Sequence, residues 1–403
     1  MKFSKLSQLF LVSGLGLMVA VLISACDIIT VDYVYVASST GSGSSSNGQI
    51  DIFAADSATG ALRTIDTSVS SGGVAPVSIT VDPAYANLYV ANAGSDSIVH
   101  FAIGLDGGLT QKDSVTLTTT PVAIAVNAAG TDLYVISGTA SATLTEYALS
   151  SGTIGSTAAS SVSLAVPGFA GDKIVPTGIT VLANSAAVFV SAYDKSAYNP
   201  GGTTTSTANP GWVFGFTVSG GALTAVSGSP WEAGIKPSGI VSDPTNRFVY
   251  ITDYTSNQLI GYTVLDGSVL KFLANGPFRT GNEPSAITID PRGRFIYLTN
   301  QLDNSVSAYG IDLTTGTPTT VTNVTGSQTN STEPQPVALI VDPALGSFVF
   351  TANYLGNSVS GFILDATAGS LKVAQSSPFP TDPKPTAITA IPHGNHATQV
   401  VGN

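Results

Sequence analysis

The chain has 403 residues with a formal net charge of −11, and only 10% of its side chains are charged. It contains no basic run, which argues against a nucleic-acid-binding surface because such surfaces need clustered Lys and Arg side chains. Three His and one Cys are too few for a Cys/His metal site.

The N-terminus predicts a bacterial export signal. Two lysines lie within the first five residues, and the 9–23 segment is largely apolar but too short for a comfortable transmembrane helix. The segment is followed by an Ile-Ser-Ala-Cys motif that ends at Cys26. This motif resembles the lipobox of bacterial lipoproteins, in which the cysteine becomes the lipidated N-terminus.

We therefore expect a signal peptide over 1–25 and a lipidated cysteine with a short linker over 26–32. Acyl chains on Cys26 would hold the protein to a membrane without spanning it. An ordinary signal peptide that happens to end near a cysteine is the alternative. Asp27 resembles a retention signal that some bacteria use to keep lipoproteins in the inner membrane.

Seven prolines mark an internal repeat, because each introduces an apolar strand and is followed about ten residues later by a second strand of the Leu-Tyr-Val-Ala-Asn type. They are Pro76, Pro121, Pro176, Pro237, Pro284, Pro336 and Pro385. Successive prolines are 45 to 61 residues apart. A repeat of this length, made of short strands, indicates a β-propeller with one blade per repeat.

The sixth blade illustrates the pattern. An alternating strand over 286–289 leads into a turn at Asp290, where Asp-Pro-Arg-Gly supplies the residues that turns favour. A continuous apolar strand follows over 295–299, then a third strand over 306–309 and a turn at Gly316. A weaker fourth strand completes the blade.

The two ends of the chain predict how the ring closes. The N-terminal copy begins with a second-strand sequence over 33–36, and the C-terminus supplies an extra first strand over 385–389. We predict an all-β fold over 33–403: seven four-stranded antiparallel blades, with the C-terminal strand completing the N-terminal blade. The tail from His393 to Asn403 has no assigned role.

Strand direction assigns each loop to one of two faces. Face X carries the loops between strands two and three and the residues before the seven prolines, whereas face Y carries the Asp-Pro and Gly turns. Long insertions over 39–48 and 194–210 both fall on face X, which favours it as the working face, although they could be loops without function. The strand that starts at Tyr33 begins on face Y, close in sequence to Cys26, so face Y should look toward the membrane.

Face X also gathers polar and aromatic residues. Amides and carboxylates bind hydroxyl groups, and tyrosine rings stack on flat ligands. The ligand-binding candidates are Asn92, Asn300, Asn353, Tyr193, Tyr254, Tyr354, Lys236, Lys384 and Gln335. The alternative is structural: Asn and Asp cap strand ends, and the charged residues form a solvated network.

Segments 88–92, 295–300 and 348–353 resemble the Tyr-Val-Thr-Asn propeller repeat, and 228–231 and 377–379 resemble a second element of such repeats. The resemblance covers nearly all of 33–390. It identifies the chain as similar to the lactonase-like seven-bladed propellers, which include 6-phosphogluconolactonase-type enzymes and surface-layer repeat proteins.

Members of that family tend to carry a His directly after the strand-one proline of some repeats, with Arg and Glu nearby. No His occupies that position here; the residues are Val77, Val122, Thr177, Ser238, Ser285, Val337 and Thr386. Glu283 and Asp253 are therefore the candidates for a catalytic base, and Lys236, Lys384 or Arg279 for charge stabilisation. We expect His100 to be a structural residue of a third strand.

Three functions remain open from the sequence. The first is a lipid-anchored module of the cell envelope that binds a glycan or an envelope protein through face X. The alternative is a lactonase-like carboxylic ester hydrolase acting on a sugar lactone, and the third is a purely structural surface protein. We predict an extracytoplasmic monomer, in the periplasm or at the cell surface, with no cofactor, and leave a divalent metal ion open.

Overall fold

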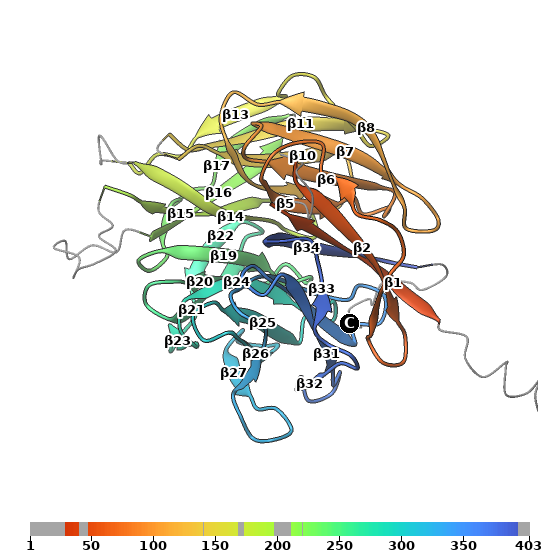
Figure 1. Cartoon of the computed structure of the whole chain (residues 1–403). Coiled ribbons are helices and arrows are strands. Elements are labelled where there is room, and N and C mark those ends of the chain that lie inside the picture. Colours follow the sequence, from red (N-terminus) through yellow and green to blue (C-terminus); the bar gives the residue numbers. More distant parts are fainter. Residues whose placement is uncertain are drawn as a thin grey trace, which may run out of the picture.

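A computed structural model describes residues 29–39, 47–139, 141–167, 173–196, 211–219 and 221–393. The regular elements of these residues are all strands (Figure 1). In this part of the chain, no helix is long and apolar enough to cross a membrane. The predicted signal peptide, Cys26 and the tail beyond His393 lie outside the described residues.

The strands form seven antiparallel sheets, one for each predicted blade. Blade 1 consists of β34 (Pro385–Pro392), β1 (Thr30–Ser38), β2 (Gln49–Asp56), β3 (Leu62–Thr64) and β4 (Val69–Ser70). Blade 2 consists of β5 (Pro76–Val81), β6 (Asn87–Asn92), β7 (Ser97–Ile103) and β8 (Leu109–Thr116). Blade 3 consists of β9 (Pro121–Val126), β10 (Asp132–Ser137), β11 (Thr143–Ser150), β12 (Thr153–Ile154) and β13 (Ser160–Ser163).

The remaining blades repeat this order. Blade 4 consists of β14 (Ile174–Val181), β15 (Val188–Asp194), β16 (Gly211–Ser219), β17 (Ala222–Ala225) and β18 (Trp231–Glu232). Blade 5 consists of β19 (Pro237–Ser242), β20 (Phe248–Asp253), β21 (Gln258–Leu265), β22 (Val269–Phe272) and β23 (Phe278–Arg279). Blade 6 consists of β24 (Pro284–Ile289), β25 (Phe295–Asn300), β26 (Ser305–Ile311), β27 (Pro318–Val321) and β28 (Thr329–Ser331). Blade 7 consists of β29 (Pro336–Val341), β30 (Phe348–Asn353), β31 (Ser358–Leu364), β32 (Leu371–Val373) and β33 (Phe379–Pro380).

Each blade has four strand positions, as predicted, and in six blades the outermost position is split into two short pieces. In blade 6, β27 pairs with the 308–311 part of β26, whereas β28 pairs with the 305–307 part of the same strand. In blade 2 a single strand, β8, spans both parts, with a register shift opposite His100. The outermost strand is therefore where the blades differ most in backbone path.

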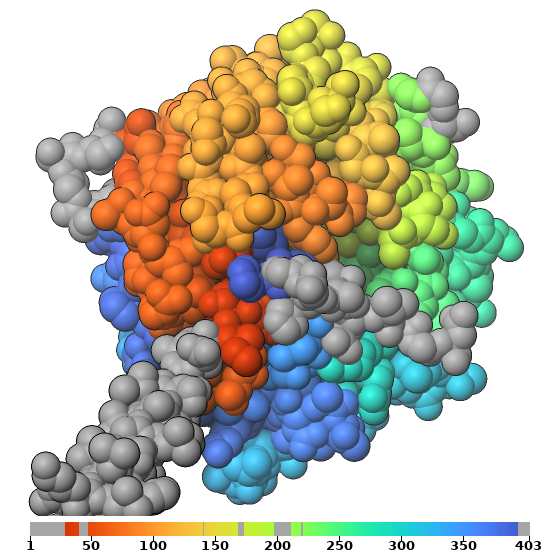
Figure 2. Space-filling view, turned by 90° about the vertical axis from the view of Figure 1, so that its right-hand side faces the viewer, coloured from red at the N-terminus to blue at the C-terminus, as the bar shows by residue number. Residues whose placement is uncertain are grey.

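The ring closes as the sequence predicts, because β34 pairs with β1 and completes the N-terminal blade. Figure 2 looks onto face Y and shows the colours running round the ring until the blue C-terminal blade meets the red N-terminal strand. This pairing covers an edge of β1 that an open sheet would expose.

Two buried carboxyl groups meet at this closure. Asp32 of β1 and Asp342 of blade 7 are both fully buried, and Asp32 accepts a hydrogen bond from the backbone N–H of Ala344 at 3.3 Å. Burial, reinforced by the neighbouring Asp342 carboxyl, raises the pKa of Asp32 to about 9. Asp32 is therefore protonated at neutral pH; burial also raises the pKa of Asp342, so the pair carries fewer than two negative charges.

The predicted Asp turns hold the link between strands one and two. Asp290 is fully buried, and its Oδ1 accepts hydrogen bonds from the backbone N–H groups of Arg294 at 2.6 Å and Phe295 at 2.7 Å. The carboxylates of Asp243 and Asp342 bind the same positions of their own turns. A buried backbone donor needs such an acceptor, which explains why Asp recurs at this point.

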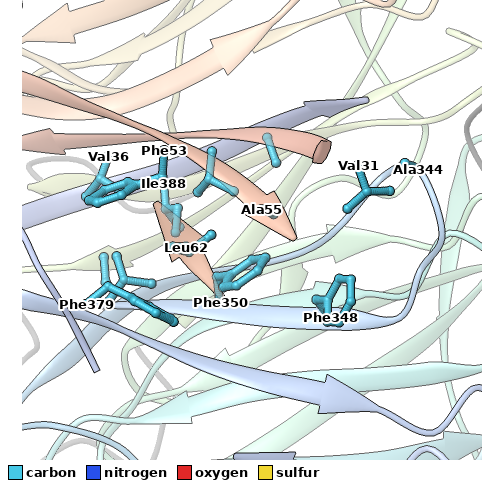
Figure 3. Packing of buried hydrophobic residues seen from close by; sticks show 14 residues of the cluster. Val31, Val36, Phe53, Ala55, Leu62, Ala344, Phe348, Phe350, Phe379 and Ile388 are labelled. Carbon is cyan, nitrogen blue, oxygen red and sulfur yellow. The ribbon is translucent and has the colours of Figure 1, made fainter. Parts of the chain in front are cut away.

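The hydrophobic core is divided between the blade interfaces. Among the described residues, seven clusters of buried apolar side chains lie one at each interface between neighbouring blades. Figure 3 shows the cluster at the closure, in which Phe348, Phe350 and Phe379 of blade 7 pack together with residues of blade 1 such as Val31, Phe53 and Ile388. Strand two is buried on both sides, as its continuous apolar sequence predicts.

A tyrosine of strand two also ties its blade to the next one on face Y. The Tyr250 hydroxyl donates to the carbonyl oxygen of Gly316 at 2.6 Å, and Tyr297 donates to Gly369 at 2.9 Å. Gly316 has φ +75°, and a Cβ there would lie 2.5 Å from the Phe248 ring. Only glycine tolerates both this backbone conformation and this close contact.

The two faces lie where strand direction predicts. β1 begins at Thr30 on face Y beside the turn after Asp56, whereas β15 ends at Asp194 on face X. In Figure 1 the start of β1 points to the right and the end of β15 to the left. Tyr33 and Asp194, at which the second insertion starts, therefore lie toward opposite faces; residues 40–46 and 197–210 of the two insertions lie outside the described residues.

Candidate functional site

An inner rim on face X is built from two residues of each blade: the residue before the strand-one proline and the residue after strand two. A backbone hydrogen bond of 2.8–3.0 Å joins the two in six blades, and in blade 4 the two are register partners. The seven pairs are Ala75–Ala93, Thr120–Gly138, Val175–Tyr193, Lys236–Tyr254, Glu283–Gln301, Gln335–Tyr354 and Lys384–Ser39.

Several rim residues have a left-handed backbone. Ala75, Glu283, Gln335 and Lys384 have φ between +53° and +61°, which costs about 1–3 kcal/mol for a residue other than glycine. For Glu283 the conformation is held by the blade before it, because its N–H donates to Asn257 Oδ1 at 2.8 Å. Gln335 and Lys384 are held in the same way by the corresponding asparagines of blades 6 and 7, Asn304 and Asn357.

Four of the predicted residues meet on this rim. The Lys236 ammonium lies 4.5 Å from the centre of the Tyr254 ring and 5.8 Å from that of Tyr193. The Tyr254 hydroxyl donates to Glu283 Oε2 at 2.6 Å. A cation, two aromatic rings and a carboxylate from blades 4, 5 and 6 thus form one connected group, the Lys236 cluster (Tyr193, Lys236, Tyr254 and Glu283).

Asp253, the other candidate base, is fully buried. Its carboxylate accepts hydrogen bonds from the backbone N–H of Ile235 at 2.8 Å, of Lys236 at 3.0 Å and of Thr255 at 3.2 Å. These bonds fix the backbone that carries Lys236. The geometry therefore favours Glu283 over Asp253 as a base, and gives Asp253 the role of positioning Lys236.

The three asparagine candidates are also fully buried. Asn353 Nδ2 donates to the hydroxyl of Ser360 at 2.9 Å, and Asn300 Nδ2 donates to that of Ser307 at 2.9 Å. Asn92 exchanges hydrogen bonds with Ser71. This geometry matches the structural alternative: Asn300 and Asn353 fasten the end of strand two to strand three of the same blade, and Asn92 fastens it to the segment that leads from blade 1 into blade 2.

The other candidates lie apart from the Lys236 cluster. Gln335, Tyr354 and Lys384 are on the rim in blades 7 and 1, where the Gln335 Oε1 atom is buried and has no hydrogen-bond partner among the described residues. Arg279 lies on β23, at the outer edge of blade 5, where its carbonyl oxygen accepts from the Tyr309 hydroxyl at 2.7 Å. The charged and aromatic residues thus occupy blades 4 to 7 and 1, whereas blades 2 and 3 contribute only Ala75, Ala93, Thr120 and Gly138.

Three of the seven residues directly after the prolines have a structural role here. The Ser285 hydroxyl donates to the Pro336 carbonyl of the next blade at 2.8 Å, and Thr386 donates to Pro76 at 2.7 Å. Ser238 makes the same contact with Pro284. These hydroxyls link neighbouring first strands round the ring.

His100 lies on β7, a third strand, as predicted, and away from the rim. It is buried, with Nδ1 2.7 Å from Asp113 Oδ2 and Nε2 2.8 Å from Asn87 Oδ1. Asp113 Oδ1 in turn accepts from the Ile154 N–H of blade 3 at 3.2 Å. His100 is thus part of a contact between blades. Within the described ranges, no three His, Cys, Asp or Glu side chains gather closely enough to hold a metal ion.

The sequence matches the family model described as "Lactonase, 7-bladed beta-propeller" over residues 45–170 and 221–330. These two stretches cover more than half of the chain. The chain belongs to the lactonase family of seven-bladed β-propellers. No curated protein matches the sequence significantly.

Solved structures share the fold of this lactonase-family propeller at low sequence identity. A periplasmic gluconolactonase of Pseudomonas aeruginosa is 18% identical with a TM-score of 0.71, covering 91% of this chain and 100% of that one. A Bacteroides fragilis protein provisionally described as a 6-phosphogluconolactonase is 17% identical with a TM-score of 0.71, covering 91% and 99%. A Bacteroides uniformis protein of the same description is 16% identical with a TM-score of 0.71, covering 90% and 100%.

Sequence reasoning missed the residues that orient the rim of this lactonase-family propeller. Asn257, Asn304 and Asn357 each stand directly before strand three and hold the backbone of the next blade. Their recurrence at one position in three successive repeats was the available signal. The left-handed conformation of Glu283 had no such signal, because glutamate rarely adopts it.

Proposed function

We propose that this protein hydrolyses a lactone at the inner rim of face X, with Glu283 as the general base and Lys236 as the cation that stabilises the oxyanion. The observation that carries the proposal is the Lys236 cluster, in which Tyr254 touches both groups: its ring lies 4.5 Å from the Lys236 ammonium and its hydroxyl 2.6 Å from Glu283. Membership of the lactonase family supports the reaction class.

The reaction needs a water molecule, a base and a cation. The Tyr254 hydroxyl occupies Oε2 of Glu283, so Oε1 is the atom that would take a proton from water as its oxygen attacks the lactone carbonyl carbon. Negative charge then develops on the carbonyl oxygen, where the Lys236 ammonium stabilises it. Collapse of the intermediate breaks the bond to the ring oxygen, which leaves with the proton, and the product is an open-chain hydroxy acid.

Each neighbour of this pair has a positioning role in the proposal. Asp253 binds the N–H groups of Ile235 and Lys236, and Asn257 binds the N–H of Glu283. Neither side chain needs to touch the substrate. Their loss would displace the base and the cation, and a small displacement lowers the rate strongly.

Ligand binding without catalysis is the second candidate. A lysine held over two tyrosine rings also suits the recognition of a flat or polyhydroxylated ligand, such as a glycan of the cell envelope. In that case the same residues would bind a ligand but not hydrolyse it. A partner protein would use the same face.

Proton release by residues 27–403 against a panel of sugar and simple δ-lactones, with and without a divalent metal ion, tests the proposal. We expect turnover above the spontaneous rate, and a loss of at least about 100-fold in Glu283→Gln, in line with removal of a general base. Glu232→Gln is the matched control, because that exposed glutamate lies on β18 at the outer edge of blade 4.

Two results would contradict the proposal. Turnover that survives Glu283→Gln would remove this residue from catalysis. If there is no turnover of any lactone, but a non-hydrolysable lactam binds to the native chain and not to Lys236→Met, the rim is a binding site. Lys372→Met, on the exposed outer strand β32, is the control for the second variant.

We further propose that the protein acts outside the cytoplasm and is anchored through Cys26. The periplasmic gluconolactonase of similar fold supports the location. Since β1 begins on face Y, an anchor at Cys26 would leave the inner rim of face X directed away from the membrane. Mass spectrometry of the membrane fraction should detect acyl chains on the N-terminal peptide, and Cys26→Ala should release the protein. Recovery of an unmodified Cys26 would contradict the anchor.

A further inference from the structure

Three blades carry a related tripeptide between the two pieces of the outermost strand. It is Ser229-Pro230-Trp231 in blade 4, Gly276-Pro277-Phe278 in blade 5 and Ser377-Pro378-Phe379 in blade 7. In each blade it lies opposite a glycine of strand three, which is Gly215, Gly261 and Gly361 respectively. The three sites can therefore be compared position by position.

In blades 4 and 7 the serine completes the backbone hydrogen bonding of that glycine. The Gly215 N–H donates to Ser229 Oγ at 2.9 Å, and the Gly361 N–H donates to Ser377 Oγ at 2.9 Å. An aromatic ring also covers each glycine, because a Cβ on Gly215 would lie 2.8 Å from Trp231 and one on Gly361 would lie 3.0 Å from Phe379. At these two sites the serine hydroxyl and the aromatic ring fill the space opposite the glycine.

Blade 5 has the same backbone register but lacks the serine. The carbonyl oxygen of Gly261 accepts from the Leu273 N–H at 2.9 Å, just as Gly215 and Gly361 accept from the corresponding residues of their blades. The position of the serine is taken by Gly276, which has no side-chain oxygen for the Gly261 N–H. The two glycines face the same gap in the outermost strand.

A pocket of about 460 Å³ opens at this gap. Its lining includes two glycines and three apolar side chains: Gly261, Gly276, Ile260, Leu273 and Phe272. The rest of its lining is Glu232, Gly234, Ile235, Ser256, Gln258 and Pro277. The Phe272 side chain is 51% exposed, and its ring lies 4.7 Å from the ring of Tyr262. The volume is in the range of pockets that take small ligands.

We propose that this pocket binds a small uncharged molecule that carries a hydroxyl or carbonyl oxygen on a compact apolar body. The ligand oxygen takes the place that Ser229 Oγ and Ser377 Oγ occupy in the other two blades and accepts from the Gly261 N–H. The apolar body packs against Ile260, Leu273 and Phe272. An anion is disfavoured by the Glu232 carboxylate, and an ammonium group has no lone pair to offer the N–H. None of the rim residues lines this pocket, and the binding proposed here does not depend on the proposed hydrolysis.

Titration followed by ¹H–¹⁵N NMR tests the inference with three probes of one shape: cyclohexanol, cyclohexylammonium and cyclohexanecarboxylate. We expect cyclohexanol to shift the Gly261 and Gly276 amide signals at millimolar concentration, and the two ions to bind at least tenfold more weakly. Gly276→Ser supplies the oxygen that blades 4 and 7 already have. A Cβ at Gly276 meets nothing closer than 3.3 Å, so the variant should fold and lose at least tenfold in cyclohexanol affinity.

Gly310→Ser is the matched control, since a Cβ there meets nothing closer than 3.9 Å and Gly310 is not part of the pocket. It should bind cyclohexanol as the native chain does. Gly276→Ala adds a methyl group without an oxygen, so it should weaken binding less than Gly276→Ser. The inference is overturned if cyclohexanol leaves the Gly261 amide unshifted, if Gly276→Ser binds it as well as the native chain, or if the carboxylate binds equally well.

Discussion

The two faces of the ring use polar residues differently. On face Y the same devices recur from blade to blade: a buried Asp holds the first turn, as at Asp243, Asp290 and Asp342, and a tyrosine hydroxyl binds the glycine turn of the next blade. On face X the inner rim pairs the same two backbone positions in every blade, but these positions carry different side chains, from Ala75 to Lys236 and Glu283.

Side chains that recur in the blades therefore belong to the architecture, whereas side chains that vary between blades are candidates for the functional site. A side chain that every blade needs recurs because each blade interface poses the same packing problem. A side chain present in one blade only, on a backbone that all blades share, is not required for that packing. Glu283 is the clearest case, since it keeps a left-handed backbone that Ala75 adopts without any functional group.

Removing a face Y carboxylate should have the largest effect. Asp290→Ala leaves the buried N–H groups of Arg294 and Phe295 without their acceptor, and we expect it to lower the free energy of unfolding by about 4 kcal/mol. Urea denaturation measures the change. Lys372→Ala on the exposed strand β32 is the control and should change little. A cost below about 1 kcal/mol would show that these turns are not the fixed part of the blade.

Removing the Asp32 carboxyl group at the closure of the ring should raise the free energy of unfolding instead of lowering it. Because the pKa of Asp32 is raised to about 9 in the fold, folding at neutral pH takes up a proton, and stability falls as the pH rises from about 4 through 9. Asp32→Asn removes this uptake and should stabilise the protein on the order of 2 kcal/mol at pH 7.

The measurement is the thermal unfolding temperature between pH 4 and 9. The native chain should lose stability across this window, and Asp32→Asn should lose less. The Asp51 carboxyl, whose pKa burial raises to about 6, adds a decline of the same sign in the acidic part of the window in both proteins. Parallel pH profiles for the two proteins would contradict a shared proton at the closure.

A hydroxyl on face X should matter for function and not for folding. Tyr254→Phe removes the donor to Glu283 but keeps the ring beside Lys236. We expect about a tenfold loss in lactone turnover, or in lactam affinity if the rim only binds, because the Glu283 carboxylate loses the hydrogen bond that orients it and a small displacement lowers the rate strongly. The unfolding temperature should stay within about 2 °C of the native value, and a larger drop would assign Tyr254 to the scaffold.

A tyrosine-to-phenylalanine substitution on face Y should lower stability and leave turnover unchanged, and we expect its effect to be the smallest of the four. Tyr297→Phe removes the buried hydrogen bond to Gly369, which should cost about 1 kcal/mol of stability and leave turnover unchanged. Calorimetry and the lactone assay on the two phenylalanine variants complete the comparison. A loss of turnover in Tyr297→Phe would mean that the two faces are not independent.

Much of the fold could be predicted because its signals are local and repeated. The strand-one prolines, the Asp turns and the second-strand pattern of 295–299 each recur, and the first-strand sequence of β34 at the C-terminus indicated the closure. The grouping of Lys236, Tyr254 and Glu283 on face X followed from strand direction. Their mutual contacts depend on side-chain conformations in three blades, and no sequence pattern encodes those.

Burial was the other feature that the sequence left undetermined. Asp253 and Glu283 are both carboxylates near a rim position, and nothing in their sequence context separates them. The structure separates them. Both Asp253 carboxylate oxygens accept hydrogen bonds from backbone N–H groups, whereas Glu283 accepts one from the Tyr254 side chain. The pocket at Gly276 could have been suspected from the sequence, since two related tripeptides carry serine where this one carries glycine.

Among the described residues, the strand that closes the ring is also the last regular element to be synthesised. Until Pro385–Pro392 leaves the ribosome, β1 has no partner on its inner edge and blade 1 cannot join blade 7. The growing chain therefore stays open-ended for almost the whole of its synthesis. If the protein is exported as an extended chain, as the proposed location requires, this order would keep the ring from closing before the chain has crossed the membrane. It also means that a chain cut short by only a few dozen residues at its end would lose the closure of the entire ring.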